Sequence, residues 1–280
     1  MREINASKIR DAVKKLYLNA NYFLPKDVLS SLKKASQTEI RKNAKSAFNI
    51  LVENASIAEN EGIPLCQDTG LAIIFAEIGQ DVHITGGGFE KAVNDGIRQA
   101  VKEGYLRASV VKSPINRINT KDNAPAIIHT EIVPGNKIKL TVLAKGGGAE
   151  NMSAIKMLKP SDGVEGIKDF VLETVKNAGP NPCPPIVVGV GIGGNFEKSA
   201  YLAKKALLRD IGKNNKDKDL AKLERELLQK INKIGIGPCG IGGKTTGLAV
   251  NIESLPCHIA SLPVAVNIEC HSHRHKSLII

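Results

Sequence analysis

The sequence predicts a mixed α/β (α+β) fold in which a helical N-terminal layer packs on mixed sheets. Apolar residues recur at helical spacing through residues 2–61. From Ala72 onward, short apolar runs indicate strands, and amphipathic segments of helical period separate them. Because neither an internal repeat nor a low-complexity linker divides the chain, we expect residues 1–280 to form a single domain. Its helical part spans 1–61, and its sheet-containing part, with the candidate site in Gly/Pro-rich turns, spans 62–280.

The helical part is predicted to contain three helices. The segment Asn5-Ala6-Ser7 offers a cap for the first helix. Pro25 interrupts the apolar pattern, which then resumes and continues in a third amphipathic run over 44–58. That run ends at the Gly62-Ile63-Pro64 break. We expect these helices to form a layer on a sheet.

The sheet-containing part is predicted to interleave strands with helices. The predicted strands cover 71–79, 81–87, 109–111, 126–133, 137–145, 184–194, 247–255 and 261–269. The predicted helices cover 89–104, 167–178 and 196–234, the last as one or two helices. Alternation within several of the strands indicates sheets with one buried face.

The composition is that of an ordinary globular protein, with 42% hydrophobic and 24% charged residues. No stretch approaches the ~20 apolar residues of a membrane helix. The N-terminus carries scattered charges and no apolar segment, so we expect a cytoplasmic protein that does not bind membranes. The net charge of +11 suits an anionic substrate. Aromatic residues make up only 4%, which disfavours nucleic-acid binding because surfaces for base stacking are scarce.

Three of the five cysteines lie in turns bounded by glycine or proline. They are Cys66 in PLCQDTG, Cys183 in NPCPP and Cys270 in VNIECHSHR. The chain has no CxxC spacing, which disfavours a zinc ribbon, and an odd cysteine count disfavours a disulfide framework. Inert thiols usually lie within apolar periodic segments, so these three are candidate ligands that converge from distant positions. Three thiolates on a [4Fe–4S] cluster would leave one iron open as a Lewis acid.

A series of ordered motifs carries a family resemblance. The motifs are PLCQDTG, LRASVV followed by NTKDNAPA, AKGGGAEN, NPCPP with GVGIGG, GPCGIGGKTT, and LPCHIASLPVAVNIECHSHR. In this order they make the chain resemble the α subunit, or N-terminal domain, of the class I fumarate hydratase and L-tartrate dehydratase family. The resemblance runs from about Glu61 to the C-terminus.

The resemblance implies a [4Fe–4S] cluster with one iron not ligated by protein. Its three ligands would be Cys66, Cys183 and Cys270. Two positions depart from the family pattern. Cys239 stands where the family more often has glutamine, and Cys257 stands where a residue other than cysteine is expected. Either of these thiols remains an alternative ligand at this point.

The resemblance also implies residues that act on the substrate. Gln67 and Asp68 match residues that contact it, and Asp68 is a candidate acid. Arg107 matches an arginine that binds a substrate carboxylate, and Gly147 matches a backbone contact. His258 matches an active-site histidine near the aspartate, and the two would deliver a proton to the leaving hydroxyl as a coupled pair.

Each substrate residue also has a purely structural interpretation. Asp68 could cap the turn at Thr69-Gly70, and Arg107 could be a surface charge at a helix end. His258 could be a hydrogen-bonded structural histidine, and the triple glycine at 146–148 could form a plain tight turn.

Two further motifs are set aside. For His271, His273 and His275, a solvated C-terminal tail is favoured over a metal-binding tract. The string GVGIGG lacks the GxGxxG spacing of a dinucleotide site, and no suitably placed acidic residue follows its next strand.

The resemblance implies the α subunit of an iron–sulfur fumarate hydratase, a hydro-lyase of the tricarboxylic acid cycle that reversibly hydrates fumarate to L-malate. A separate β subunit would carry the catalytic base and further carboxylate-binding residues, in an (αβ)2 heterotetramer. The α subunit of an L(+)-tartrate dehydratase is the alternative. A non-enzymatic metal-binding or sensing protein is a third possibility, and its closed metal site would need a fourth thiol such as Cys239.

Overall fold

The computed structural model describes residues 1–280, and the chain divides into two compact units. Unit 1 consists of residues 1–25, 55–147 and 274–280. Unit 2 consists of residues 26–54 and 148–273. The predicted mixed α/β class is confirmed, whereas the single domain stays a prediction. The helical first 61 residues are divided between the two units.

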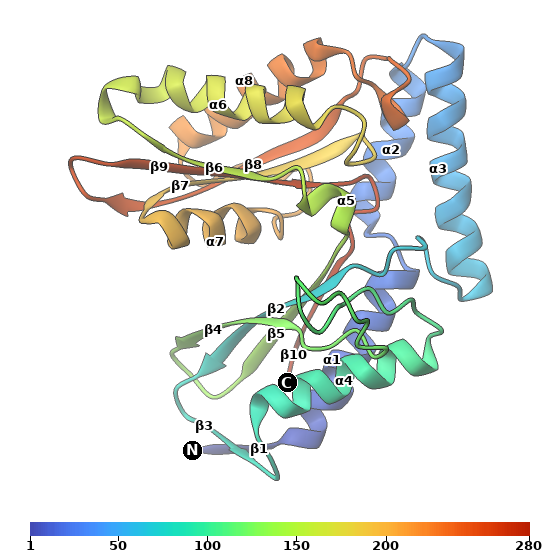
Figure 1. Cartoon of the computed structure of the whole chain (residues 1–280), viewed down its shortest axis with the longest axis vertical. Coiled ribbons are helices and arrows are strands. Elements are labelled where there is room, and N and C mark those ends of the chain that lie inside the picture. Colours follow the sequence, from blue (N-terminus) through green and yellow to red (C-terminus); the bar gives the residue numbers. More distant parts are fainter. The chain divides into compact units, whose positions relative to one another are not determined.

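Unit 1 is a four-stranded sheet with two helices packed on it (Figure 1). Its elements are β1 (Arg2–Asn5), α1 (Ala6–Tyr22), β2 (Leu71–Gly79), β3 (Val82–Thr85), α4 (Phe89–Glu103), β4 (Ile127–Val133), β5 (Ile138–Lys145) and β10 (His275–Ile279). The strand order is β10-β5-β2-β4, and only the β2–β4 pair is parallel. Strands β1 and β3 form a separate parallel pair.

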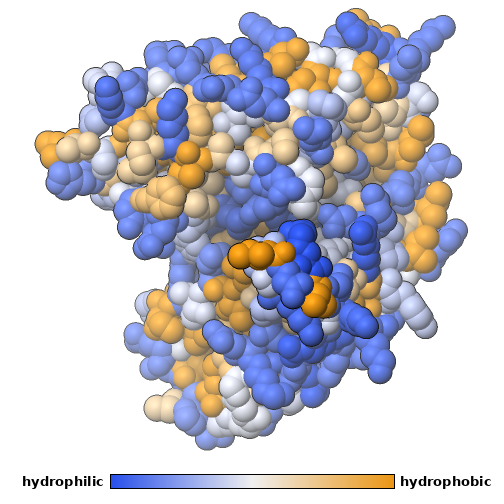
Figure 2. Space-filling model, in the orientation of Figure 1, coloured by the Kyte–Doolittle hydropathy of each residue, from blue (hydrophilic) through white to orange (hydrophobic).

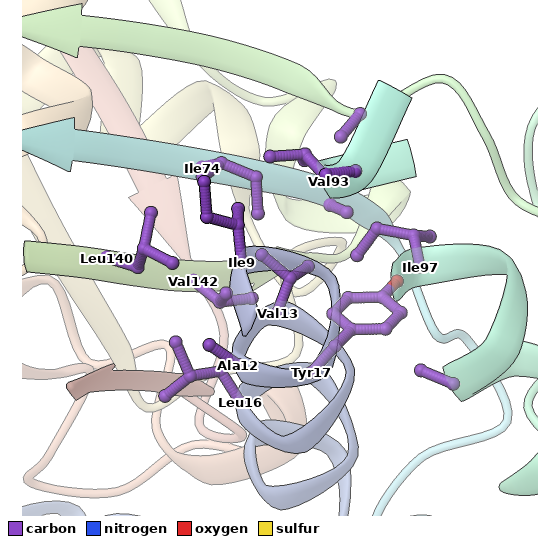
Figure 3. Close-up of a cluster of buried hydrophobic side chains, with 14 of the residues drawn as sticks. Ile9, Ala12, Val13, Leu16, Tyr17, Ile74, Val93, Ile97, Leu140 and Val142 are labelled. Atoms are coloured by element: carbon purple, nitrogen blue, oxygen red, sulfur yellow. The ribbon is translucent and has the colours of Figure 1, made fainter. Parts of the chain in front are cut away.

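The core of unit 1 lies between the sheet and helices α1 and α4. The Asn5 side chain accepts a hydrogen bond from the Ser7 amide and begins α1, as the sequence predicts. Ile9, Val13 and Tyr17 then present one face of α1 to the sheet and to α4, as Figure 3 shows. Residues at this spacing share one side of a helix, so the periodicity of the sequence is what buries them.

Unit 2 is a four-stranded sheet with helices on both faces (Figure 1). Its elements are α2 (Lys26–Thr38), α3 (Lys42–Glu61, whose last residues belong to unit 1), α5 (Gly147–Glu150, which begins on the last residue of unit 1), β6 (Ala154–Leu158), a 3₁₀ turn (Pro160–Asp162), α6 (Gly163–Ala178), β7 (Ile186–Gly194), α7 (Phe196–Ala206), α8 (Lys218–Ile234), a 3₁₀ turn (Pro238–Gly240), β8 (Gly247–Cys257) and β9 (Leu262–Glu269). The strand order is β6-β9-β7-β8, with β7 parallel to β8 and antiparallel to β9.

The glycines of GVGIGG serve helix packing. A Cβ on Gly189 would lie 2.1 Å from the backbone oxygen of Ala203 in α7, and one on Gly191 would lie 2.0 Å from that of Ser199. Such approaches are impossible for any residue with a side chain, so β7 carries glycine where α7 lies against it. The contact between β7 and α7 therefore explains why glycine occurs at positions 189 and 191, and no dinucleotide site is needed to explain it.

Three sequence predictions differ from the structure. The segment 109–111 forms only an isolated bridge between Val111 and Asn119 rather than a strand. Strands β1, β6 and β10 were not predicted. The solvated C-terminal tail is wrong, because His273 and His275 are buried and β10 pairs with β5. Because β10 is hydrogen-bonded to β5, these two histidines, before and in β10, are buried although they are polar.

The surface mixes polar and apolar groups. Figure 2 shows mainly hydrophilic side chains on the face that it draws, with hydrophobic side chains dispersed among them. None of the helices combines the length and the apolar character needed to cross a membrane.

Candidate functional site

The turn PLCQDTG in unit 1 brings Cys66 and Asp68 together. The Asp68 amide donates a hydrogen bond to the Cys66 sulfur at 3.4 Å, and the same thiol lies 3.4 Å from the side-chain oxygen of Gln67. Gln67 is exposed, and Cys66 is partly exposed. The Cys66 sulfur is therefore held within the turn by its two neighbours, with part of its surface open to a ligand.

The Asp68 carboxylate is held by donors from three segments of unit 1. Its Oδ2 accepts a hydrogen bond from the Gly147 amide at 2.8 Å. Its Oδ1 accepts from the Gly70 amide at 2.9 Å and from the Ser109 hydroxyl at 3.2 Å. The bond to Gly70 is the turn cap that the structural interpretation expected. The other two donors are remote in sequence, so a local cap does not account for the whole arrangement.

These donors set the protonation state of Asp68. Burial is the largest single influence and raises the pKa of the carboxyl group. Hydrogen bonds from Gly147, Gly70 and Ser109, together with the charge of Arg274, outweigh it and lower the pKa below its ordinary value of 3.8. Asp68 is therefore a carboxylate at neutral pH, and it must first take up a proton before it can act as an acid.

Close backbone contact requires glycine at position 70 of this turn. Gly70 has φ of +74°, and a Cβ there would lie 2.4 Å from the backbone oxygen of Lys145. A Cβ on Gly146 would lie 3.4 Å from Asp68 Oδ2. The Gly147 amide is committed to Asp68, so its predicted contact with substrate stays a prediction. Gly146 and Gly147 thus line the Asp68 carboxylate.

Arg274 is a residue of this site that sequence reasoning missed. Its side chain is 1% exposed, and its Nη1 donates to the Asp68 backbone oxygen at 2.8 Å and to the Asn21 side chain at 3.0 Å. It joins the turn at Asp68 to helix α1. The available signal was its place as the last residue of NIECHSHR, in a segment that the sequence assigned to a solvated tail.

Arg107 lies in the loop that follows α4. Its guanidinium is exposed and has no hydrogen bond or ion pair to another residue. Ser109, two residues later, is the group that contacts Asp68. The same short segment therefore carries a free cation and a donor to the carboxylate.

In unit 2, Cys183 is exposed in a rigid proline-bounded turn. Its φ is +53°, and its amide donates to the backbone oxygen of Pro180 at 3.0 Å. Its own backbone oxygen accepts from the His271 amide at 3.3 Å and lies 2.9 Å from His271 Nδ1. Because His271 follows Cys270, the start of β7 and the end of β9 are tied together at the two predicted ligands.

The two remaining cysteines lie at opposite ends of the unit 2 sheet. Cys239 is exposed beside the Cys183 turn, where its amide donates to the backbone oxygen of Pro184 at 2.7 Å. Burial and then the charge of Cys183 raise the pKa of the Cys239 thiol. Cys257 is the last residue of β8, which runs parallel to β7 away from Cys183. Of the two, only Cys239 lies near a predicted ligand of unit 2.

His258 is not brought near Cys183 and Cys270, the two predicted ligands of its own unit. It is exposed in the turn from β8 to β9, where its Nδ1 accepts from the Ala260 amide at 3.1 Å. Cys270 follows the far end of β9, which has 8 residues. At about 3.3 Å per residue, that strand separates the two by roughly 25 Å. Unit 2 therefore carries His258 at one end of its sheet and Cys183 with Cys270 at the other.

The thiols suit an iron–sulfur cluster by their chemistry. Cys66, Cys183 and Cys270 form no disulfide and are at least partly exposed. The hydrogen bond from the Asp68 amide to Cys66 is of the kind that sulfur ligands of iron–sulfur clusters accept. Within either unit, no three histidine, cysteine, aspartate or glutamate side chains lie together as a metal site.

Comparison with known proteins covers nearly the whole chain. Residues 10–279 match the family model described as "Fumarate hydratase (Fumerase)". A protein of Methanocaldococcus jannaschii with the provisional name L(+)-tartrate dehydratase subunit alpha is 47% identical over 273 residues, or 95% of each chain. L(+)-tartrate dehydratase subunits alpha of Escherichia coli O157:H7 and of strain K12 are each 32% identical over 264 residues, 92% of this chain and 86% of theirs.

Proposed function

The chain belongs to the fumarate hydratase family, and from this premise we propose that it is the α subunit of an iron–sulfur hydro-lyase that reversibly hydrates fumarate to L-malate. The observation that carries the proposal is the Asp68 carboxylate, fixed beside the Cys66 thiol by donors from separate segments. A proton-transfer group next to a metal-ligating thiol is what a metal-assisted dehydration requires.

Cys66, Cys183 and Cys270 are the proposed ligands of a [4Fe–4S] cluster. The support is that each thiol is at least partly exposed and in no disulfide, and that the Asp68 amide donates a hydrogen bond to Cys66. A cluster whose fourth iron has no protein ligand supplies a Lewis acid that polarises the C–O bond of the substrate. The residues of the chain then have to bind the dicarboxylate and move the proton.

Arg107 is the proposed anchor for one substrate carboxylate. Its guanidinium is exposed and unpaired, and arginine matches a carboxylate through two parallel hydrogen bonds. Gln67, also exposed, lies next to Asp68 and is the proposed second polar contact. The Gly147 amide contributes indirectly, by holding Asp68 Oδ2.

Asp68 is the proposed carrier of the proton. In dehydration it would give a proton to the departing hydroxyl, which leaves as water, and in hydration it would accept a proton from water. Oδ2 accepts one hydrogen bond and Oδ1 accepts two, so Oδ2 has more capacity to bond the proton. Because Asp68 rests ionised, the proton must reach it from a partner, and His258 is the proposed partner.

A separate β subunit is the proposed partner chain. The relatives at 47% and 32% identity are named alpha subunits, and a catalytic base that takes the proton from carbon is not among the residues of the Asp68 site. The β subunit would carry that base and further carboxylate-binding residues, in an (αβ)2 assembly.

His258 acts beside the cluster only if it comes from a second copy of the chain. The length of β9 keeps it away from Cys183 and Cys270 of its own unit. We therefore predict that His258→Ala and Cys183→Ser, each inactive alone, regain activity when the two variants are co-assembled. One site in each mixed assembly would then have an intact histidine and an intact cysteine.

The measurement is turnover of the mixture against each variant alone. Co-assembly of Cys183→Ser with Cys270→Ser is the control, since both residues serve one cluster from the same end of the sheet. That mixture should stay inactive. A His258→Ala and Cys183→Ser mixture that is no more active than its parts contradicts the role of a second copy.

Dehydration of L(+)-tartrate is the second candidate function, because the relatives bear that name. The test is anaerobic reconstitution of the chain with its β subunit and iron, followed by turnover of L-malate, fumarate and L(+)-tartrate. We expect kcat/KM to be larger for malate and fumarate. A preference for tartrate would replace the proposal with the second candidate. A cluster-loaded pair that acts on none of them would overturn both and favour a non-enzymatic metal protein.

A further inference from the structure

A buried amide lies between the two segments that carry Asp68 and Arg107. The Asn123 side chain is 0% exposed and makes three hydrogen bonds within unit 1. Its Nδ2 donates to the backbone oxygen of Gly70 and to the Tyr17 hydroxyl, each at 2.9 Å. Its Oδ1 accepts from the Ser109 amide at 2.7 Å. The amide therefore uses its donor and its acceptor side at once.

These hydrogen bonds link the segment of Asp68 to the segment of Arg107. Gly70 lies two residues after Asp68, and Ser109 lies two residues after Arg107. The Ser109 hydroxyl also contacts Asp68 Oδ1 directly. A shift of Asn123 would therefore move the Arg107 segment relative to the Asp68 turn and loosen the bond between them.

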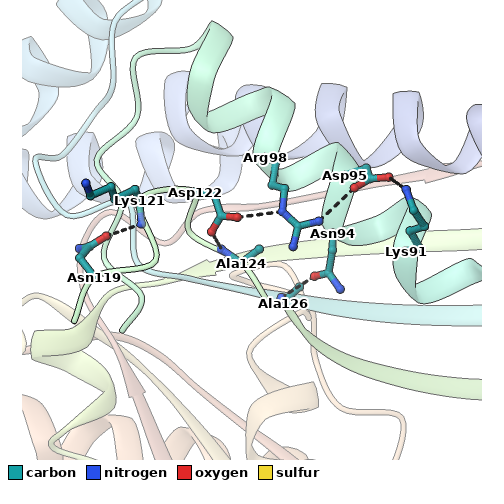
Figure 4. A network of polar contacts seen from close by, with 9 residues as sticks. All are labelled: Lys91, Asn94, Asp95, Arg98, Asn119, Lys121, Asp122, Ala124 and Ala126. Carbon is teal, nitrogen blue, oxygen red and sulfur yellow. Dashed lines mark hydrogen bonds and ion pairs between the residues drawn. The ribbon is translucent and has the colours of Figure 1, made fainter. Parts of the chain in front are cut away.

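The backbone of Asn123 is itself constrained. Its φ is +57°, a conformation that asparagine tolerates better than most residues. Figure 4 shows how its neighbours are anchored to α4. Arg98 donates to Asp122 at 2.8 Å, and the Asp122 carboxylate accepts from the Ala124 amide at 3.1 Å. With both neighbours fixed, the side chain of Asn123 has little freedom except to reach Gly70 and Ser109.

Tyr17 completes the arrangement from helix α1. Its hydroxyl is buried and donates to the Gly70 oxygen at 3.2 Å while it accepts from Asn123. Burial raises the pKa of Tyr17, so the hydroxyl keeps its proton. The Gly70 backbone oxygen thus accepts hydrogen bonds from both Tyr17 and Asn123. An ionised aspartate at position 123 has no donor and could not bond to the Gly70 oxygen.

We propose that Asn123 is a positioning residue that fixes the Asp68 carboxylate relative to the Arg107 guanidinium. The inference rests on the proposed hydro-lyase function, which gives these two groups their roles. Asn123 itself touches no substrate. A misplacement of about 1 Å in such a pair lowers turnover by about 100-fold, because the proton and the bound carboxylate are no longer aligned.

The decisive variant is Asn123→Gly, measured in the cluster-loaded complex with the β subunit. Glycine keeps the backbone at positive φ without strain and removes the side chain that makes the three hydrogen bonds. We expect kcat per cluster to fall by about 100-fold and KM to rise, since both the proton carrier and the carboxylate anchor move. Tyr17→Phe, which keeps Asn123 but removes its hydroxyl partner, should lose less.

Lys121→Gly is the matched control. Lys121 lies in the same loop, is exposed, and has φ of +67°. It should keep the kcat and KM of the wild type. If Asn123→Gly shows the kinetics of Lys121→Gly at equal cluster content, the positioning role is overturned. Such a result would mean that the placement of Asp68 and Arg107 does not depend on the Asn123 amide.

Hydrogen exchange of the α chain in the same complex separates this inference from the proposed function. We expect faster exchange at 66–70 and 107–111 in Asn123→Gly, and wild-type exchange there in Lys121→Gly. Inactivity of the wild type on all three substrates would refute the function. Unchanged exchange at both segments in Asn123→Gly would refute the inference, whichever substrate the complex turns over.

Discussion

Cys183→Ser is expected to abolish both the cluster and the hydro-lyase activity. Cys183 is exposed in a turn held by Pro180 and His271, so the thiol can change without disturbing the core. Loss of the Lewis acid removes several kcal/mol of transition-state stabilisation. Since about 1.4 kcal/mol is tenfold in rate, we expect a fall of at least about 1000-fold. Iron and sulfide content, together with turnover of L-malate, measure the two effects.

Two other cysteines serve as controls for this result. Cys257→Ser should keep cluster and activity, because Cys257 lies at the other end of the unit 2 sheet. Cys239→Ser separates an open cluster from a closed four-thiolate site. If Cys239→Ser loses its iron while Cys270→Ser retains it, the ligand set is wrong and the case for an open iron fails.

Asp68→Asn is expected to lower kcat by about 100- to 10,000-fold, the range for loss of a positioned proton-transfer group. The amide cannot carry the proton. Gly147, Gly70 and Ser109 all donate to the carboxylate. The NH₂ group of the asparagine would therefore face at least one of these donors and lose that hydrogen bond. The cluster content should change little, since the Asp68 amide that contacts Cys66 belongs to the backbone.

Ser109→Ala is the graded control for Asp68→Asn. It removes one of the three donors to the carboxylate and leaves the group that moves the proton, so its kcat should fall less. The measurement is kcat per cluster in both variants. An Asp68→Asn enzyme with wild-type kcat at full cluster content would remove Asp68 from the mechanism.

Local patterns were enough for most of the fold. The apolar spacing of α1 and α4 and the runs of β2, β5 and β7 are properties of contiguous residues, and the structure confirms them. Strand β10 escaped prediction because its partner β5 lies far away in the sequence, and three histidines beside it suggested a solvated end. The segment 109–111 has strand-like residues, but it pairs only with its own loop at Asn119.

Some residues of the candidate site could be identified from the sequence, and others could not. The motifs identify Cys66, Cys183 and Cys270 as candidate ligands, because thiols in glycine- and proline-bounded turns are visible in the sequence itself. Arg274 and Asn123 gave no such signal. Their roles depend on burial against Asn21, Gly70 and Ser109, and none of these contacts is local.

The sequence by itself determined the fold class, most of the helical and strand segments, and the family to which the chain belongs. Tertiary structure alone decided which groups lower the pKa of Asp68 and that Arg274 is buried beside it. The physical reason is sequence distance. The Asp68 carboxylate meets the Gly147 amide across 79 residues, and no local pattern encodes which groups such a distance brings within 2.8 Å.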